Sequence, residues 1–160
     1  MRPLVLGLGN DLLSDDTVGI LAARALKQQL PHQADVIESP LAGLALLDIL
    51  TGYSQAVIID AICTGQHPPG TIIRLGLDDL SRVRAPTPHF SGLPEIFALA
   101  QQLQLDFPQD LVIFAMEVED PFTIGGGLSP AVRHALPALI DQVAAQVTEW
   151  AQTPATPPAD

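Results

Sequence analysis

Residues 4–19 combine three features that occur together in α/β proteins: a short apolar strand, a turn with two glycines and the start of a helix. In open α/β folds such a turn lies beyond the carboxyl end of a strand, where ligands bind. A phosphate is the usual ligand, because free backbone N–H groups and the helix dipole favour an anion. Here Asp15 and Asp16 occupy that place. Their negative charge opposes a phosphate and favours a cation.

The apolar pattern along the rest of the chain predicts alternating strands and helices. We expect strands at 3–8, 34–38, 55–60, 71–77 and 110–116, and helices at 17–30, 41–50, 93–103 and from 130 to about 151. Ser129 is expected to cap the last helix, Pro130 to begin it and Pro137 to bend it. The alternation predicts an α/β fold, with a mostly parallel, twisted sheet of about five strands sandwiched between helices.

The length of 160 residues fits one domain, which we expect to span 1–151. Segment 78–90 is expected to be an irregular loop, and the proline-bearing segment 152–160 a disordered tail. No apolar run approaches the roughly 20 residues that span a bilayer, and the first residues lack the pattern of a secretory signal. The single cysteine, Cys63, excludes an internal disulfide. Together these features predict a cytoplasmic protein.

The formal net charge is -11, from 7 Lys plus Arg against 18 Asp plus Glu. This balance argues against nucleic acid as a partner, because the chain has no basic stripe that would displace counterions from phosphates. It argues equally against an anionic membrane surface. A partner with basic segments, or a metal centre, fits better. The simpler interpretation, that the acidity only aids solubility, stays open.

Three candidate site residues come from segments that a parallel sheet would gather at its carboxyl edge. They are Asp16, Asp60 at the end of an apolar strand, and His89 just before a helix. Each has an ordinary alternative role, as a partner of the helix dipole, a turn former or a solvated loop histidine. Together, two carboxylates and one imidazole form a ligand set for a first-row divalent ion, with positions left open for a partner's ligands or for water. The remaining histidines have no such setting and are expected at the surface: His32, His67 and His134.

Two further chemistries have weaker support. The chain has no Gly-x-Ser-x-Gly elbow, and no basic residue flanks Cys63 to activate its thiol, so we expect a small buried residue there. Gly7 and Gly9 begin a dinucleotide fingerprint, but Leu12 occupies the third glycine position. Glu38, near the end of the second strand, is a candidate for holding a ribose. A nucleotide-binding protein therefore stays as a weaker hypothesis.

With Asp16, Asp60 and His89 taken together, the chain resembles the maturation proteases of nickel–iron hydrogenases. The resemblance runs from residue 2 to about residue 150. It rests on four groups of residues: 7–19, 57–61, His89 ahead of 93–97, and Glu117 with 127–130.

The resemblance implies an α/β sandwich and an endopeptidase that removes the C-terminal extension of the hydrogenase large-subunit precursor after nickel insertion. Members of the family contact the precursor's nickel through a carboxylate, an aspartate and a histidine. By position these would be Asp16, Asp60 and His89, serving both as nickel ligands and as catalytic residues. Many members have Glu where this chain has Asp16. Asp15 also matches the motif and is expected to cap the helix rather than bind metal.

The implied nickel is carried by the precursor, and no organic cofactor is implied. The ion would tether the precursor, and either polarise the scissile bond or activate a water. The loop at 125–127, expected to be flexible, and segment 78–88 are placed to shape a groove for the extension. The competing hypothesis is a non-catalytic metal-binding or chaperone-like module that acts on the same precursor.

Overall fold

The computed structural model describes residues 1–79, 89 and 92–153. The strands are β1 (Leu4–Leu8), β2 (Asp35–Ser39), β3 (Gln55–Ile62), β4 (Ile72–Gly76) and β5 (Asp110–Glu117). The helices are α1 (Val18–Gln29), α2 (Ala45–Leu50), α3 (Leu93–Gln102) and α4 (Pro130–Gln152), with short 3-10 turns η1 (Asp15–Thr17) and η2 (Leu77–Asp79). The predicted alternation of strands and helices is confirmed.

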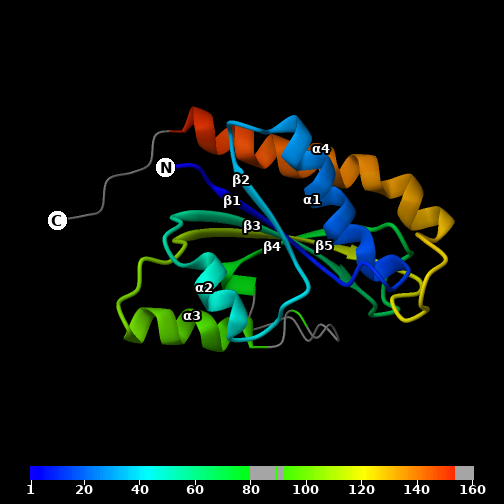
Figure 1. Cartoon of the computed structure of the whole chain (residues 1–160), viewed down its shortest axis with the longest axis horizontal. Coiled ribbons are helices and arrows are strands. Elements are labelled where there is room, and N and C mark those ends of the chain that lie inside the picture. The colour runs from blue at the N-terminus through cyan, green and yellow to red at the C-terminus, as the bar shows by residue number, and fades with distance from the viewer. Residues whose placement is uncertain (80–88, 90–91, 154–160) are drawn as a thin grey trace.

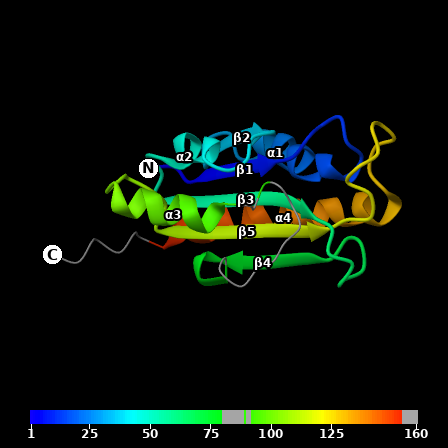
Figure 2. The same cartoon turned by 90° about the horizontal axis from the view of Figure 1, so that it is seen from below.

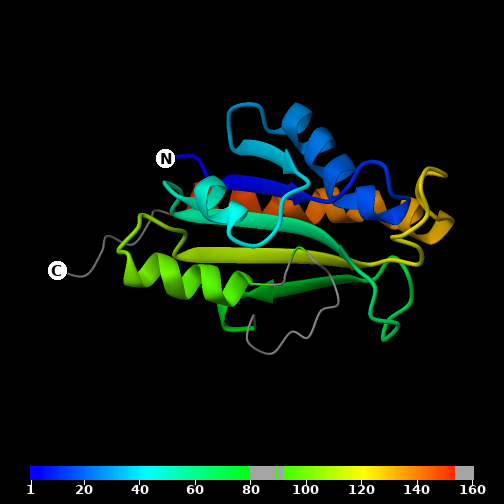
Figure 3. The ribbon, with the colours of Figure 1, turned by 60° about the horizontal axis from the view of Figure 1, so that its bottom comes forward.

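The strands form one sheet in the order β2-β1-β3-β5-β4 (Figure 2). Strands β2, β1, β3 and β5 are parallel, whereas β4 runs antiparallel to β5. Figure 3 shows β5 lying between β3 and β4, although β4 comes earlier in the chain. The connection from β3 to β4 is too short for a crossover helix, which agrees with the reversed direction of β4. The predicted mostly parallel sheet of five strands is confirmed.

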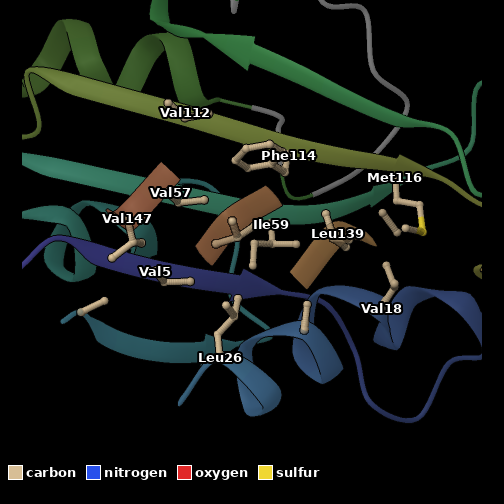
Figure 4. Packing of buried hydrophobic residues seen from close by; sticks show 14 of the residues in the cluster. Val5, Val18, Leu26, Val57, Ile59, Val112, Phe114, Met116, Leu139 and Val147 are labelled. Carbon is tan, nitrogen blue, oxygen red and sulfur yellow. The ribbon is translucent and has the colours of Figure 1, made fainter. Parts of the chain in front are cut away.

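Helices cover both faces of the sheet, with α1 and α4 on one face and α2 and α3 on the other (Figure 1). Alternate strand residues point to opposite faces. Val57 and Ile59 pack against the α1 and α4 layer (Figure 4), whereas Ile58 and Ile62 pack in the α2 and α3 layer. The alternation places Asp60 on the α2 and α3 face.

The start of helix α1 approaches strand β1 very closely, because glycines occupy the contact. A Cβ on Gly7 would lie 2.3 Å from the Gly19 carbonyl oxygen and 2.6 Å from the Ala23 Cβ. A Cβ on Gly19 would lie 2.3 Å from the Leu8 oxygen and 2.7 Å from the Ile59 oxygen. Two of the glycines in the first motif therefore serve helix–strand packing, which brings the start of α1 close to β3.

Several predicted boundaries differ from the observed ones. Helix α2 begins at Ala45 rather than at residue 41. Gly43 has a φ of 62°, which is incompatible with a right-handed helix at that residue. Strand β3 continues two residues beyond Asp60, so this aspartate lies within the strand and not at its end. Helix α4 runs through Pro137 as one element, and the bend expected there stays a prediction.

Two predictions fall largely outside the described residues. Of the loop expected at 78–90, the structure describes the end of η2 and His89. Of the tail expected at 152–160, it describes Gln152, which is the last residue of α4, and Thr153. Within the described ranges, no helix has the length and apolar character needed to cross a membrane.

Candidate functional site

The structure brings the three predicted donors together at the carboxyl edge of the sheet. Asp16 comes from η1, Asp60 from β3, and His89 from the segment before α3. One ligand atom from each residue lies within 4.8 Å of the other two. Asp60 is fully buried, His89 is 7% exposed, and the Asp16 side chain is 15% exposed. Asp16 is therefore the most exposed of the three donors.

The orientation of His89 is set by the loop after β2. Its Nδ1 lies 3.2 Å from the Leu41 carbonyl oxygen. Because a carbonyl only accepts, Nδ1 carries a hydrogen and donates it. The other ring nitrogen, Nε2, faces Asp16 Oδ2 at 3.7 Å. This arrangement leaves Nε2 as the nitrogen for a metal ion, as in metal sites where an oxygen outside the ligand set fixes the tautomer.

Backbone N–H groups orient the two carboxylates. The Asn10 amide donates to Asp16 Oδ2 at 2.9 Å, and the Ala61 amide donates to Asp60 Oδ1 at 2.8 Å. These contacts, like that of the Leu41 carbonyl with His89, are made by backbone atoms. Sequence reasoning therefore missed Asn10, Ala61 and Leu41 as supports of the site. The donors are held in place before any ion arrives.

The electrostatics of the cluster favour a positive charge. The pKa of His89 is raised to about 9, mainly by the close Asp16 carboxylate and also by the charge of Asp60, while burial opposes the shift. The imidazolium proton thus balances the two carboxylates. A divalent ion would take the place of this proton, since imidazole ligates in its neutral form.

Asp15 has a different role from the one expected. Neither η1 nor α1 has a side-chain cap, so Asp15 does not cap the helix that it precedes. Its buried carboxylate accepts hydrogen bonds from the Ser129 amide (2.7 Å), the Ser129 hydroxyl (2.9 Å), the Glu119 amide (3.1 Å) and the Asp120 amide (2.9 Å). Ser129 precedes α4 as predicted, but its hydroxyl bonds to Asp15 instead of capping α4. Asp15 therefore anchors the loop after β5 to the turn that carries Asp16.

Cys63 is poorly suited to act as a nucleophile. It is partly buried, and its pKa is raised, first by burial and then by the charge of Glu117. The neutral thiol is weakly nucleophilic. Glu117 itself is 1% exposed and accepts hydrogen bonds from the amide and the hydroxyl of Thr64. Its carboxylate holds the start of the β3–β4 connection.

The geometry of the first turn disfavours a bound nucleotide. Glu38, the candidate ribose ligand, is engaged by Arg24 through two contacts of 2.9 Å. The close approach of α1 fills the space beside Gly7 and leaves no room there for a phosphate. The histidines outside the cluster are exposed, as predicted: His32, His67 and His134.

The comparison with protein families decides the class of the protein. A family model described as hydrogenase maturation protease (HycI) matches residues 20–146. The chain belongs to the hydrogenase maturation protease family. It is thus an endopeptidase of hydrogenase maturation, as predicted, and the hypothesis of a non-catalytic module is not supported.

Individual relatives are similar over nearly the whole chain. The hydrogenase 2 maturation protease of Escherichia coli (strain K12) is 29% identical over 153 residues, which are 93% of this chain and 92% of that protein. The structure of the E. coli hydrogenase maturating endopeptidase HybD superposes with a TM-score of 0.81 at 29% identity and covers 93% of each chain. The nickel–iron hydrogenase maturation protease HybD of Thermococcus kodakarensis has a TM-score of 0.71 at 25% identity, covering 92% of this maturation protease and 99% of that chain.

Proposed function

We propose that this maturation protease removes the C-terminal extension of a nickel–iron hydrogenase large-subunit precursor after nickel insertion, and that it contacts the precursor's nickel through Asp16, Asp60 and His89. The observation that carries the proposal is the convergence of one donor atom from each of these residues within 4.8 Å. Membership of the maturation protease family supports the reaction and the class of substrate.

The donor set suits a borderline first-row ion. Imidazole favours nickel, zinc or iron, and carboxylates complete the set. Ligands of one such ion lie roughly 3 to 4.2 Å apart, depending on the angle between them. The three donors are therefore close to ligating distances and would draw together further on binding the ion. Nickel remains part of the substrate: the precursor's own cysteines hold it, and Asp16, Asp60 and His89 occupy its remaining positions.

This arrangement makes the ion a tether. Once nickel is bound between the two proteins, the bond to be cut is held at a fixed place relative to Asp16, which is the most accessible donor. The ion would also polarise the scissile carbonyl or lower the pKa of a water. Because the pKa of the only thiol, Cys63, is raised, a thiolate nucleophile is disfavoured.

The test follows the intact mass of a hydrogenase large-subunit precursor, loaded with nickel or free of it. We expect loss of a C-terminal peptide only from the nickel-loaded precursor. Asp16→Ala and His89→Ala should remain folded by circular dichroism and lose cleavage. Matched controls are Asp48→Ala and His134→Ala, which alter exposed residues of the same types. Cleavage that persists in either site variant would overturn the assignment of the donors.

We also propose the cytoplasm as the compartment of this reaction. The chain has one cysteine and no disulfide, which agrees with a reducing environment.

A further inference from the structure

Three large apolar side chains protrude from the loops at the carboxyl edge of the sheet. Leu12 is 67% exposed, Phe122 is 78% exposed and Ile124 is 82% exposed. Single exposed apolar residues are ordinary on protein surfaces. These three, however, come from two loops that are bonded to each other, and we refer to them as the apolar loop patch.

Hydrogen bonds join the two loops into one unit. The Ser14 amide donates to the Thr123 oxygen at 2.9 Å, and the Ser14 hydroxyl donates to the Gly125 oxygen at 2.7 Å. In return the Gly125 amide donates to the Leu12 oxygen at 2.9 Å. Leu13 and Ile124 form an isolated β-bridge. The backbone that carries the patch is therefore held in place by these bonds. Binding of a partner would cost little conformational entropy in these loops.

A second set of bonds holds the segment around Phe122. The Asp120 carboxylate accepts the Phe122 and Thr123 amides, each at 3.0 Å, and also the Thr123 hydroxyl. The same segment is anchored from within by Asp15, which accepts the Asp120 amide. Asp15 is the neighbour of the donor Asp16 in η1. The patch and the candidate site thus belong to one hydrogen-bonded structure.

The charges beside the patch are mostly negative. Glu119 and Asp120 precede Phe122, and Asp11 precedes Leu12. The cation that pairs with Asp11, Arg24, also binds Glu38. An apolar surface bordered by Lys or Arg complements this arrangement. A second copy of this chain does not complement the patch in this way, because each copy carries a formal charge of -11 and the two would repel each other.

We propose that the apolar loop patch docks the folded body of the hydrogenase large-subunit precursor, through an apolar hollow bordered by basic residues. This inference rests on the proposed function, because it takes the same precursor as partner. The patch side chains protrude, so the complementary hollow belongs to the partner, and buried aromatic anchors of this kind carry much of an interface's affinity. The extension itself would lie at the donors, and the patch would hold the body from which it emerges.

The test replaces two patch residues together, in Phe122→Ser/Ile124→Ser. Binding is measured by calorimetry with the nickel-free precursor, which the protein is not expected to cleave, and kinetics are measured with the nickel-loaded precursor. We expect Kd and KM to rise at least about tenfold, with kcat unchanged within about twofold. Binding should also weaken as NaCl is raised from low to physiological concentration.

The matched control is Leu103→Ser, which removes a 57% exposed leucine after α3, at the opposite end of the sheet from His89. It should leave Kd and KM unchanged. The proposal is overturned if the patch variant retains wild-type Kd and KM, or if kcat alone falls, since that would mean the loops position Asp16 and do not dock. It is also overturned if sedimentation velocity shows a wild-type dimer that the patch variant dissociates.

The two proposals fail separately. If the wild-type protein binds the precursor without cleaving it and the patch variant loses binding, docking stands and the proposed function fails. If cleavage requires nickel but the patch variant binds as the wild type does, the proposed function stands and docking fails.

Discussion

Asp15 and Ser129 are 114 positions apart in sequence and are joined by two hydrogen bonds, at 2.7 Å from the Ser129 amide and 2.9 Å from its hydroxyl. The next residue, Asp16, turns toward His89, whose Nε2 lies 3.7 Å from its carboxylate. Two adjacent aspartates therefore face different parts of the molecule. One holds a loop, and the other is a candidate ligand.

Replacing Asp15 by Ala should destabilise the fold by about 2–4 kcal/mol. The change removes a buried carboxylate and leaves the amides of Ser129, Glu119 and Asp120 without their acceptor. Urea unfolding measures the loss, and hydrogen exchange should speed up at those amides. Asp48→Ala, on an exposed face of α2, should cost less than about 0.5 kcal/mol. Equal stability of the two variants would mean that Asp15 does not anchor the loop.

The stability of the metal-free protein should fall between about pH 6.5 and pH 9. The pKa of His89 is about 9 in the folded protein and near 6.5 in an unfolded chain, so the bound proton favours the folded state. This contribution is complete below pH 6.5 and is lost as the pH rises through 9. Its upper limit is about 3 kcal/mol.

Unfolding of wild type and His89→Gln in EDTA, compared across this pH range, isolates the effect. The difference in unfolding free energy between the two proteins should shrink as the pH rises. A difference that is constant with pH would contradict the shifted pKa. Cys63 responds at higher pH, because its pKa is raised from 9.0.

Gly19→Ala should destabilise the protein by at least about 3 kcal/mol and should lower cleavage further than the loss of folded protein accounts for. The added Cβ would lie 2.3 Å from the Leu8 oxygen, which forces α1 away from the sheet and moves Asp16 away from Asp60. Gly76→Ala is the control, because its nearest contact would be 3.8 Å and its backbone requires no glycine. Thermal unfolding and cleavage of the precursor measure both effects. A Gly19→Ala protein as stable and active as Gly76→Ala would refute the packing argument.

Cys63→Ala should retain cleavage at the wild-type rate within about twofold. Burial and the charge of Glu117 raise the pKa of this thiol, so little thiolate is present at neutral pH. The measurement is intact mass of the nickel-loaded precursor over time. If the variant binds the precursor but leaves it uncut, the thiol takes part in the reaction after all.

Much of the fold was predictable because the central strands are continuously apolar. Strands β1, β3 and β5 are buried along nearly their whole length, and this composition is typical of parallel strands covered on both faces. The position of β4 was not predictable, since its pairing with β5 depends on tertiary arrangement. Helix α2 was predicted too long because leucines and alanines suit a helix, whereas Gly43 turns the chain.

The meeting of Asp16, Asp60 and His89 was predictable from topology alone, because parallel strands end at one edge. The role of Asp15 was not, because three of its four hydrogen-bond donors are backbone amides more than 100 positions away. A backbone amide leaves no trace in a sequence pattern. The same holds for the Leu41 carbonyl that orients His89.

The place of β5 between β3 and β4 has a consequence for synthesis on the ribosome. Strand β4 pairs with β5 and not with β3, so it has no partner in the sheet until residues 110–117 have left the exit tunnel. His89 lies in the chain between these two strands. A nascent chain that has exposed Asp16, Asp60 and His89 therefore still has an incomplete sheet, and the candidate site would be complete only after translation of β5.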